Sequence, residues 1–215
     1  MGNLEYLVGG PHLEVQDEDV DQMFRLLVEG CKKDGQDPMV EQIRDEMREG
    51  IRTPGYIVVM DDKKMVGVGS FKVVNKTEDG RPIVELRRSA INPNYQSQYV
   101  GHHLYMVAIK IVETLYPNAV IVAATRSRYL KKSSPKRGYR IVSVPEFAEL
   151  ANLGDETDLN SMEERGFFGT VFDQAKLSPI EKVQAKAQRF TDSLILLPGG
   201  DKIFSVLSKL KSLGR

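Results

Sequence analysis

The sequence has one cysteine, no net charge and no long apolar run, and each of these shortages excludes a class of protein. Cys31 alone cannot form a disulfide within the chain, which favours a reducing compartment such as the cytoplasm. Thirty basic and thirty acidic residues cancel, so no net charge drives binding to nucleic acid or an anionic membrane. No apolar run approaches the roughly 20 residues of a membrane-spanning helix. Residues 1–11 lack the features of a signal peptide, so we expect a cytoplasmic protein.

The apolar pattern predicts a folded core over the first two thirds of the chain. Hydrophobic residues make up 41% of the 215 residues, which suits one domain, or one domain with an appendage. Helical spacing indicates helices, and β-rich runs indicate strands. The predicted elements are helices over 17–28 and 39–50, a hairpin of strands over 56–60 and 65–74, a strand over 83–91, a helix over 104–115, and strands over 119–124 and 139–144.

This element order predicts an α/β, or α+β, fold in which helices flank a mixed central sheet. The helix over 104–115 joins two strands as a crossover, so we expect the strands over 83–91 and 119–124 to be parallel. The hairpin strands that precede them are antiparallel, which makes the sheet mixed.

Residues 145–215 differ in character and are predicted to be mainly helical. The run Ser178-Pro179-Ile180-Glu181 has the pattern of a helix start, with a capping box and a proline at the first position. An apolar stripe from Ile203 to Leu213 indicates a basic final helix packed on the main domain or on a second subunit. A helix on a membrane surface is the alternative. We therefore expect a domain over 1–144 and a helical extension over 145–215, through which the chain would form a homodimer.

The segment from Val84 to Ile111 carries the strongest functional signal. It predicts a strand, a short polar turn and a helix, with Gln96, Ser97, Gln98 and Gly101 around the start of the helix. The first N–H groups of a helix have no partner within it and lie at the positive end of its dipole. Such a turn suits a pyrophosphate group.

This segment resembles the signature of the general N-acetyltransferase (GNAT) superfamily. That signature places Gln or Arg, two residues, Gly, one residue, and Gly or Ala between a strand and a helix. The matching residues are Gln96-Ser97-Gln98-Tyr99-Val100-Gly101. Asn92–Tyr95 resembles the family's strand exit, and Lys136–Arg140 resembles its closing motif. The resemblance covers about residues 12–144, and it implies a GNAT-like fold with acetyl-CoA as co-substrate.

The resemblance also implies which residues hold acetyl-CoA. In the family, N–H groups at the end of the strand polarise the thioester carbonyl, and the turn and helix start hold the pyrophosphate. It assigns this binding to Ser89, Ala90, Ile91, Gln96, Ser97, Gln98, Tyr99, Val100, Gly101 and His102.

The sequence departs from the family pattern at two points. Tyr99 replaces the first glycine, which in the family lets the backbone approach the phosphate without a side chain. Ser133 and Ser134 stand where many members have a tyrosine that protonates the departing thiolate. Serine is a poor acid, so that role is vacant, is left to Ser134, or falls to Tyr129.

Glu85 is the best candidate for the base that deprotonates the incoming amine. It stands eleven residues before Gln96, a spacing that resembles the catalytic glutamate of the family's histone-type members. The alternative is that Glu85 pairs with a neighbouring arginine or faces solvent.

The remaining candidates are weaker. His102 and His103 are adjacent and point to different faces of a helix, so we expect packing or phosphate contact but no metal site. The basic stretch Arg126–Arg140 has no acidic residue and suits the CoA phosphate, an acidic substrate, RNA or plain solvation.

We therefore expect an acetyl-CoA-dependent N-acetyltransferase that acts on a primary amine of a small molecule or protein, with neither a membrane nor nucleic acid as the favoured partner. An inactive GNAT-fold binding module is the second interpretation. An acetyltransferase acting on aminoacyl-tRNA or another RNA-linked amine is the third.

Overall fold

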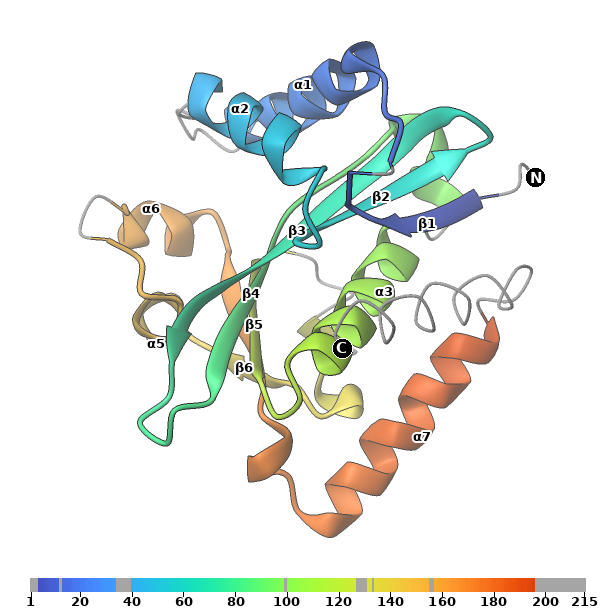
Figure 1. Ribbon diagram of the computed structural model, residues 1–215. Helices are drawn as coiled ribbons and strands as arrows, with labels where there is room; N and C mark the ends of the chain where they lie inside the picture. The colour runs from blue at the N-terminus through green and yellow to red at the C-terminus, as the bar shows by residue number, and fades with distance from the viewer. Residues whose placement is uncertain are drawn as a thin grey trace. The chain divides into compact units, whose positions relative to one another are not determined.

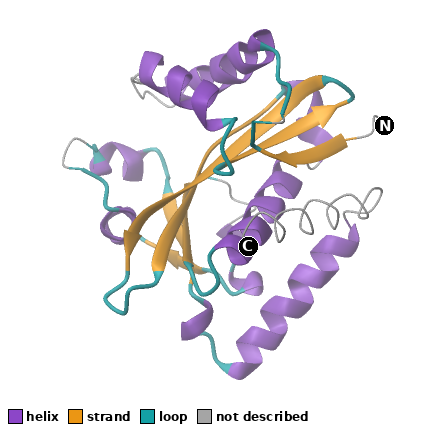
Figure 2. Cartoon of the chain, viewed as in Figure 1, coloured by secondary structure: helices purple, strands orange, loops and turns teal. Residues whose placement is uncertain are grey.

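The structure is a computed structural model that describes residues 4–11, 13–33, 40–98, 100–126, 131–132, 134–154 and 157–195. Its strands form one seven-stranded mixed sheet in the order β1-β2-β3-β4-β5-β7-β6, flanked by helices (Figures 1 and 2). This confirms the expected fold class. The chain divides into two compact units, and the boundary expected at residue 144 stays a prediction. The first unit is Met1–Phe71, Arg88–Ile111 and Gly199–Arg215, and the second is Lys72–Arg87 and Val112–Pro198.

The first unit is built on an antiparallel set of strands covered by two helices. β1 (Leu4–Val8) pairs with β2 (Tyr56–Asp61), and β2 pairs with β3 (Lys64–Lys76), which confirms the predicted hairpin. α1 (Asp17–Lys33) and α2 (Val40–Gly50) confirm the two predicted helices. Their apolar faces and the sheet share a core that includes Met23, Met47, Val58, Met65 and Val68.

The strand–turn–helix predicted from the sequence is present. β4 (Pro82–Ile91) leads through a 3₁₀ turn, η1 (Pro93–Gln98), into α3 (Val100–Leu115). A Cβ atom at Gly69 of β3 would lie 3.2 Å from the side chain of Leu104, so α3 packs directly on β3. Figure 1 shows α3 on the face of the strands away from α1 and α2.

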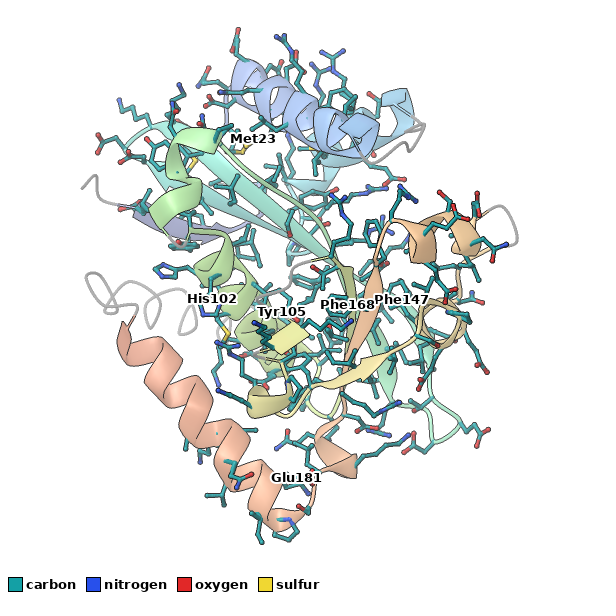
Figure 3. The ribbon with its side chains drawn as sticks, turned by 180° about the vertical axis from the view of Figure 1, so that it is seen from behind. Met23, His102, Tyr105, Phe147, Phe168 and Glu181 are labelled. Carbon is teal, nitrogen blue, oxygen red and sulfur yellow. The ribbon has the colours of Figure 1, made fainter. Side chains whose placement is uncertain are left out.

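The second unit contains the later strands of the described chain. β5 (Val120–Thr125) pairs in parallel with β4 from Ile83–Val120 to Glu85–Val122, which confirms the predicted crossover. β7 (Phe168–Phe172) pairs antiparallel with both β5 and β6 (Arg140–Val142), so it lies between them. The core of this unit includes Ile83, Val122, Val171 and Phe147, whose side chain is labelled in Figure 3.

Within the described residues, three helices follow the predicted core. These are α5 (Val144–Ala151), α6 (Leu159–Glu164) and α7 (Pro179–Ile195). α7 begins as the capping box predicts: the Glu181 N–H donates to the Ser178 hydroxyl at 3.3 Å, and the Ser178 N–H donates to the Glu181 carboxylate at 2.8 Å. Two further 3₁₀ turns are η2 (Pro135–Arg137) and η3 (Gln174–Lys176).

Two strands were not expected from the sequence. β1 is short, and β7 comes from the region that was expected to be mainly helical. All five residues of β7 are buried, so its sequence has no alternation to mark a strand. Gly169 stands within the strand because a side chain does not fit there: a Cβ atom would lie 2.5 Å from Val142 and 2.6 Å from Phe147. The apolar stripe from Ile203 to Leu213 lies outside the described residues.

Candidate functional site

The end of β4 departs from a regular strand at Arg88, where φ is 53°. Asp62, Asn118 and Asn152 also have positive φ, but they lie in turns or at a helix end, where these residue types are tolerated. This left-handed conformation is the one found in a common type of β-bulge, so we refer to the irregularity at Arg88 as the bulge. Ser89 follows and is exposed, although β4 lies inside the sheet. The irregularity at Arg88 is therefore followed by an exposed residue in a strand that lies inside the sheet.

Two glycines of β3 let the end of β4 and helix α3 approach closely. A Cβ atom at Gly69 would lie 3.2 Å from Leu104 and 3.3 Å from the hydroxyl oxygen of Ser89. A Cβ atom at Gly67 would lie 2.6 Å from Ile91. Sequence reasoning missed both positions, although a Gly-x-Gly inside a strand indicates a close approach of another backbone.

Hydrogen bonds fix the turn between β4 and α3. The buried side chain of Asn92 accepts from the Asn94 N–H at 3.1 Å, and the Asn92 N–H donates to the carbonyl of Val66 at 2.9 Å. The Tyr95 hydroxyl donates to the Asp61 carboxylate at 2.7 Å. This bond is the main reason that the pKa of Tyr95 is raised, with burial adding to it. The predicted strand exit is thus a turn tied to β2 and β3.

Helix α3 begins with a buried residue and an exposed glycine. Val100 is fully buried, and Gly101 follows it. The nearest atom that a Cβ at Gly101 would meet is Ile91 Cγ1 at 3.6 Å, an ordinary contact, so packing does not require glycine here. A glycine within a helix costs about 0.5–1 kcal/mol relative to alanine, and a ligand that approaches the backbone is a physical reason to keep one. Tyr99 and the side chains of residues 96–98 lie outside the described part.

The two histidines occupy the first turns of α3. The His103 ring centre lies 6.1 Å from that of Tyr6 on β1 and 6.4 Å from that of His102, which is labelled in Figure 3. Burial, and to a lesser degree His102, lowers the pKa of His103 to about 4, so this ring is neutral at pH 7. His103 therefore packs toward β1.

Glu85 lies on β4 three residues before the bulge. Its carboxylate is 3.8 Å from the guanidinium of Arg87, and its side chain is 13% exposed. The pairing with a neighbouring arginine, one of the two open interpretations, is therefore present in the structure. A contact of this length is a weak ion pair, and the role of Glu85 as a base stays a prediction.

The model of the Acetyltransferase (GNAT) family matches residues 20–128, slightly more than half of the chain. This chain belongs to the acetyltransferase (GNAT) family. The match includes β4, the turn and the whole of α3, which are the elements that form the geometry above.

Solved structures share the GNAT fold with this chain. An acetyltransferase of the GNAT family from Staphylococcus aureus Mu50 matches with a TM-score of 0.52 and 7% identity, over 80% of this chain and 99% of that one. N-acetylglutamate synthase from Neisseria gonorrhoeae, complexed with coenzyme A and N-acetyl-glutamate, matches with a TM-score of 0.51 and 12% identity. That match covers 80% of this chain but only 35% of the synthase. A Mycobacterium tuberculosis protein, Rv2747, solved with CoA matches with a TM-score of 0.50 and 14% identity, over 75% and 97% of the two chains. No curated protein sequence matches.

Ser134 is not an exposed candidate for the acid that protonates the departing thiolate in the GNAT family. That residue is 2% exposed, and its carbonyl accepts from the N–H groups of Arg137 at 2.9 Å and Tyr139 at 3.0 Å. Ser134 thus begins the 3₁₀ turn η2 and is part of the packing. Tyr129 and Ser133 lie outside the described residues, so the assignment of Tyr129 stays a prediction.

Some residues of the basic stretch of this GNAT chain make contacts within the second unit. Arg126 lies 5.3 Å above the ring centre of Phe167, and Lys131 lies 5.4 Å above that of Phe168. Arg137 is buried. Two of these cations thus lie over aromatic rings, while Lys132, Lys136 and Arg140 of the same stretch are exposed.

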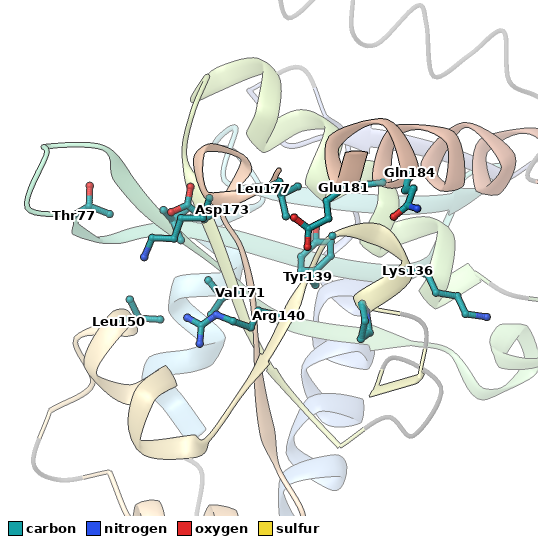
Figure 4. Close-up of a pocket in the computed structure, with 15 residues that line it drawn as sticks. Thr77, Lys136, Tyr139, Arg140, Leu150, Val171, Asp173, Leu177, Glu181 and Gln184 are labelled. Atoms are coloured by element: carbon teal, nitrogen blue, oxygen red, sulfur yellow. The ribbon is translucent and has the colours of Figure 1, made fainter. Parts of the chain in front are cut away.

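The second unit contains a pocket of about 400 Å³ where β5 begins (Figure 4). Both of its acidic side chains already have partners. Asp173 accepts from Arg81 at 2.6 Å, and Glu181 caps α7 through Ser178. The apolar part of its lining includes Val120, Leu150, Val171 and Leu177.

Among the described residues, no three His, Cys, Asp or Glu side chains are placed to share a metal ion. His12 and the side chain of Cys31 lie outside that part, so the expectation of no metal stays a prediction. No helix in the same part is long and apolar enough to cross a membrane.

Proposed function

We propose that this chain transfers the acetyl group of acetyl-CoA directly to a primary amine of a small molecule or protein. The observation that carries the proposal is the junction of β4 and α3 within the first unit. There an exposed Ser89 follows a strand bulge, and Ile91 lies within contact distance of Gly101 at the helix start. The residues present fit acetyl-CoA because they supply an exposed strand end at Ser89 and a glycine in the first turn of the helix that follows.

Each part has a chemical role in the proposed transfer. The N–H groups at the start of α3 bind the pyrophosphate. The N–H groups of Ser89–Ile91 polarise the thioester carbonyl, where negative charge develops as the amine attacks. Glu85 removes a proton from the ammonium group, so that nitrogen can form the new C–N bond as the C–S bond breaks. The thiolate takes its proton from solvent or from Tyr129.

Two other functions were open from the sequence. Burial of Ser134 and the Arg87 contact of Glu85 favour a binding module that has lost catalysis. An RNA-linked acceptor has less support, because the thirty basic and thirty acidic residues of the chain cancel and the buried Arg137 is not available to a ligand.

Calorimetry with acetyl-CoA, followed by an assay for release of the CoA thiol, tests the proposal. The acceptors are spermidine, free lysine and a lysine-containing peptide, which present primary amines on three kinds of scaffold. We expect saturable binding and faster thiol release with at least one amine. Binding without transfer to any amine supports the binding module. Absence of binding at millimolar acetyl-CoA refutes both.

We also propose a cytoplasmic homodimer that forms through the C-terminal helices. Helix α7 supports this, because Ile180 and Val183 are 70% and 69% exposed on it. Light scattering on the full chain and on an Ile180→Lys, Val183→Lys variant tests the proposal. We expect a dimer that becomes a monomer in the variant, and a monomeric wild type contradicts it.

A further inference from the structure

Arg88 is an unusual residue at a strand bulge. Its φ of 53° costs an L-amino acid about 1–2 kcal/mol, because Cβ then crowds the following carbonyl oxygen, and glycine is the usual choice. Among the described residues, it is the only non-glycine with positive φ inside a helix or strand. The surrounding structure must therefore hold this backbone in place.

The side chain of Arg88 connects β4 to α2 and β2. Its guanidinium forms an ion pair with Glu46 of α2 and a hydrogen bond with Tyr56 of β2. The arginine side chain is only 20% exposed. Burial lowers the pKa of Arg88, but the bonds to Glu46 and Tyr56 outweigh it, and the net direction is upward. The guanidinium of Arg88 thus interacts with residues of two different elements, Glu46 of α2 and Tyr56 of β2.

Helix α2 also packs against Tyr56. A Cβ atom at Gly50, the last residue of α2, would lie 2.1 Å from the ring of Tyr56. The helix backbone therefore lies directly on the ring. Arg88 thus interacts with two elements, α2 and β2, that pack closely on each other.

We propose that the ion pair between Arg88 and Glu46 positions the β4 backbone of Ser89–Ile91 for the thioester. This inference rests on the proposed function. Arg88 and Glu46 are positioning residues: the backbone angles at Arg88 set the directions of the N–H groups that follow it. The pyrophosphate site at the start of α3 does not depend on them.

The test compares Glu46→Ala with a matched variant, Asp21→Ala. Asp21 of α1 forms an ion pair at 2.7 Å with Arg44 of α2, the helix that also carries Glu46. The side chains of Asp21 and Arg44 are 24% and 40% exposed, and this pair joins α1 and α2 only. We measure amide ¹H–¹⁵N resonances of Ser89–Ile91, and kcat and the Kd for CoA. We expect Glu46→Ala to shift these resonances and to lower kcat about tenfold while the Kd stays within about twofold. Asp21→Ala should leave all three unchanged.

A third variant, Arg88→Gly, separates the effect of the arginine side chain from the effect of the backbone conformation. Glycine at position 88 adopts positive φ without strain but cannot form the ion pair with Glu46. We therefore expect Arg88→Gly to lower kcat as much as Glu46→Ala does. Full kcat in Arg88→Gly, or equal behaviour of Glu46→Ala and Asp21→Ala, overturns the inference. If the wild type transfers no acetyl group, the proposed function fails, and the amide resonances still decide whether Glu46 sets this backbone. Melting temperatures of all variants show that each is folded.

Discussion

Arg81 allows the effect of burial on an ion pair to be measured with one cation. Its guanidinium lies 2.6 Å from the carboxylate of Asp173 and 2.8 Å from that of Asp79. The Asp173 side chain is 7% exposed and the Asp79 side chain is 62% exposed. The two pairs share Arg81 and have nearly the same shortest distance, but they differ in burial, and Asp173 also accepts a second bond from Arg81 at 3.2 Å. Burial alone would raise the pKa of Asp173, but Arg81 and the Ala175 N–H outweigh it and lower the pKa.

We predict that Asp173→Asn lowers the free energy of unfolding by about 2–3 kcal/mol, because it leaves the charge of Arg81 without its buried partner. This is below the effect expected for a fully buried pair, since Arg81 is 20% exposed. Asparagine still accepts a hydrogen bond from Ala175, so the cap of η3 is kept. Asp79→Asn should produce no measurable change, because its pair with Arg81 is open to solvent.

Urea unfolding at pH 7, followed by circular dichroism, measures both variants. Circular dichroism suits the chain because it has no tryptophan. The folded pKa of Asp173 is below the ordinary 3.8, so its contribution is present above pH 3.8 and is lost as pH falls through the folded pKa. The difference between wild type and Asp173→Asn should shrink accordingly in acid. Equal losses in the two variants, or a larger loss in Asp79→Asn, would refute the argument from burial.

Three further predictions concern the candidate site. Lowering the pKa of His103 from 6.5 to about 4 corresponds to about 3 kcal/mol, which solvent screening of this half-buried ring reduces to about 1.5 kcal/mol. This stability is present above pH 6.5 and lost toward pH 4, and urea unfolding at pH 7 and pH 4.5 should show the loss in wild type but not in His103→Phe. Gly101→Glu should raise the calorimetric Kd for CoA about tenfold or more by placing a negative charge at the helix start, whereas a similar rise in Gly101→Ala would show that bulk alone is responsible. Glu85→Gln should lower the rate of amine acetylation at neutral pH roughly tenfold; an unchanged rate, equal to that of the control Glu146→Gln, would remove Glu85 from the mechanism.

The parts of the fold that the sequence predicted are those with a strong local signal. The hairpin, the crossover and the helix start at Ser178 each depend on residues close together in the chain. β7 was missed because its identity as a strand comes from partners about 30 and 50 residues earlier, not from its own pattern.

The candidate site likewise has one part that the sequence predicted and another that it did not. The turn and helix start were predicted from the motif around Gln96 and Gly101. The bulge at Arg88 was not, because an arginine gives no local sign of a left-handed backbone. Its explanation lies in Glu46 and Tyr56, which come from earlier elements and meet it only in the folded chain. Ser134 was proposed from its position in the motif; its burial is visible only in the folded chain, and its role as an acid stays a prediction.

The position of β7 has a consequence for how the chain folds during synthesis. β6 pairs with β7, and β7 pairs with β5, so residues 140–142 acquire their sheet partner only after Phe172 has been made. Until then, β5 presents an unpaired edge of buried-type residues, Val120 to Ala123, to other chains. A nascent chain that stalls before residue 168 is therefore expected to aggregate, and the late pairing gives the second unit the non-local contacts that slow folding.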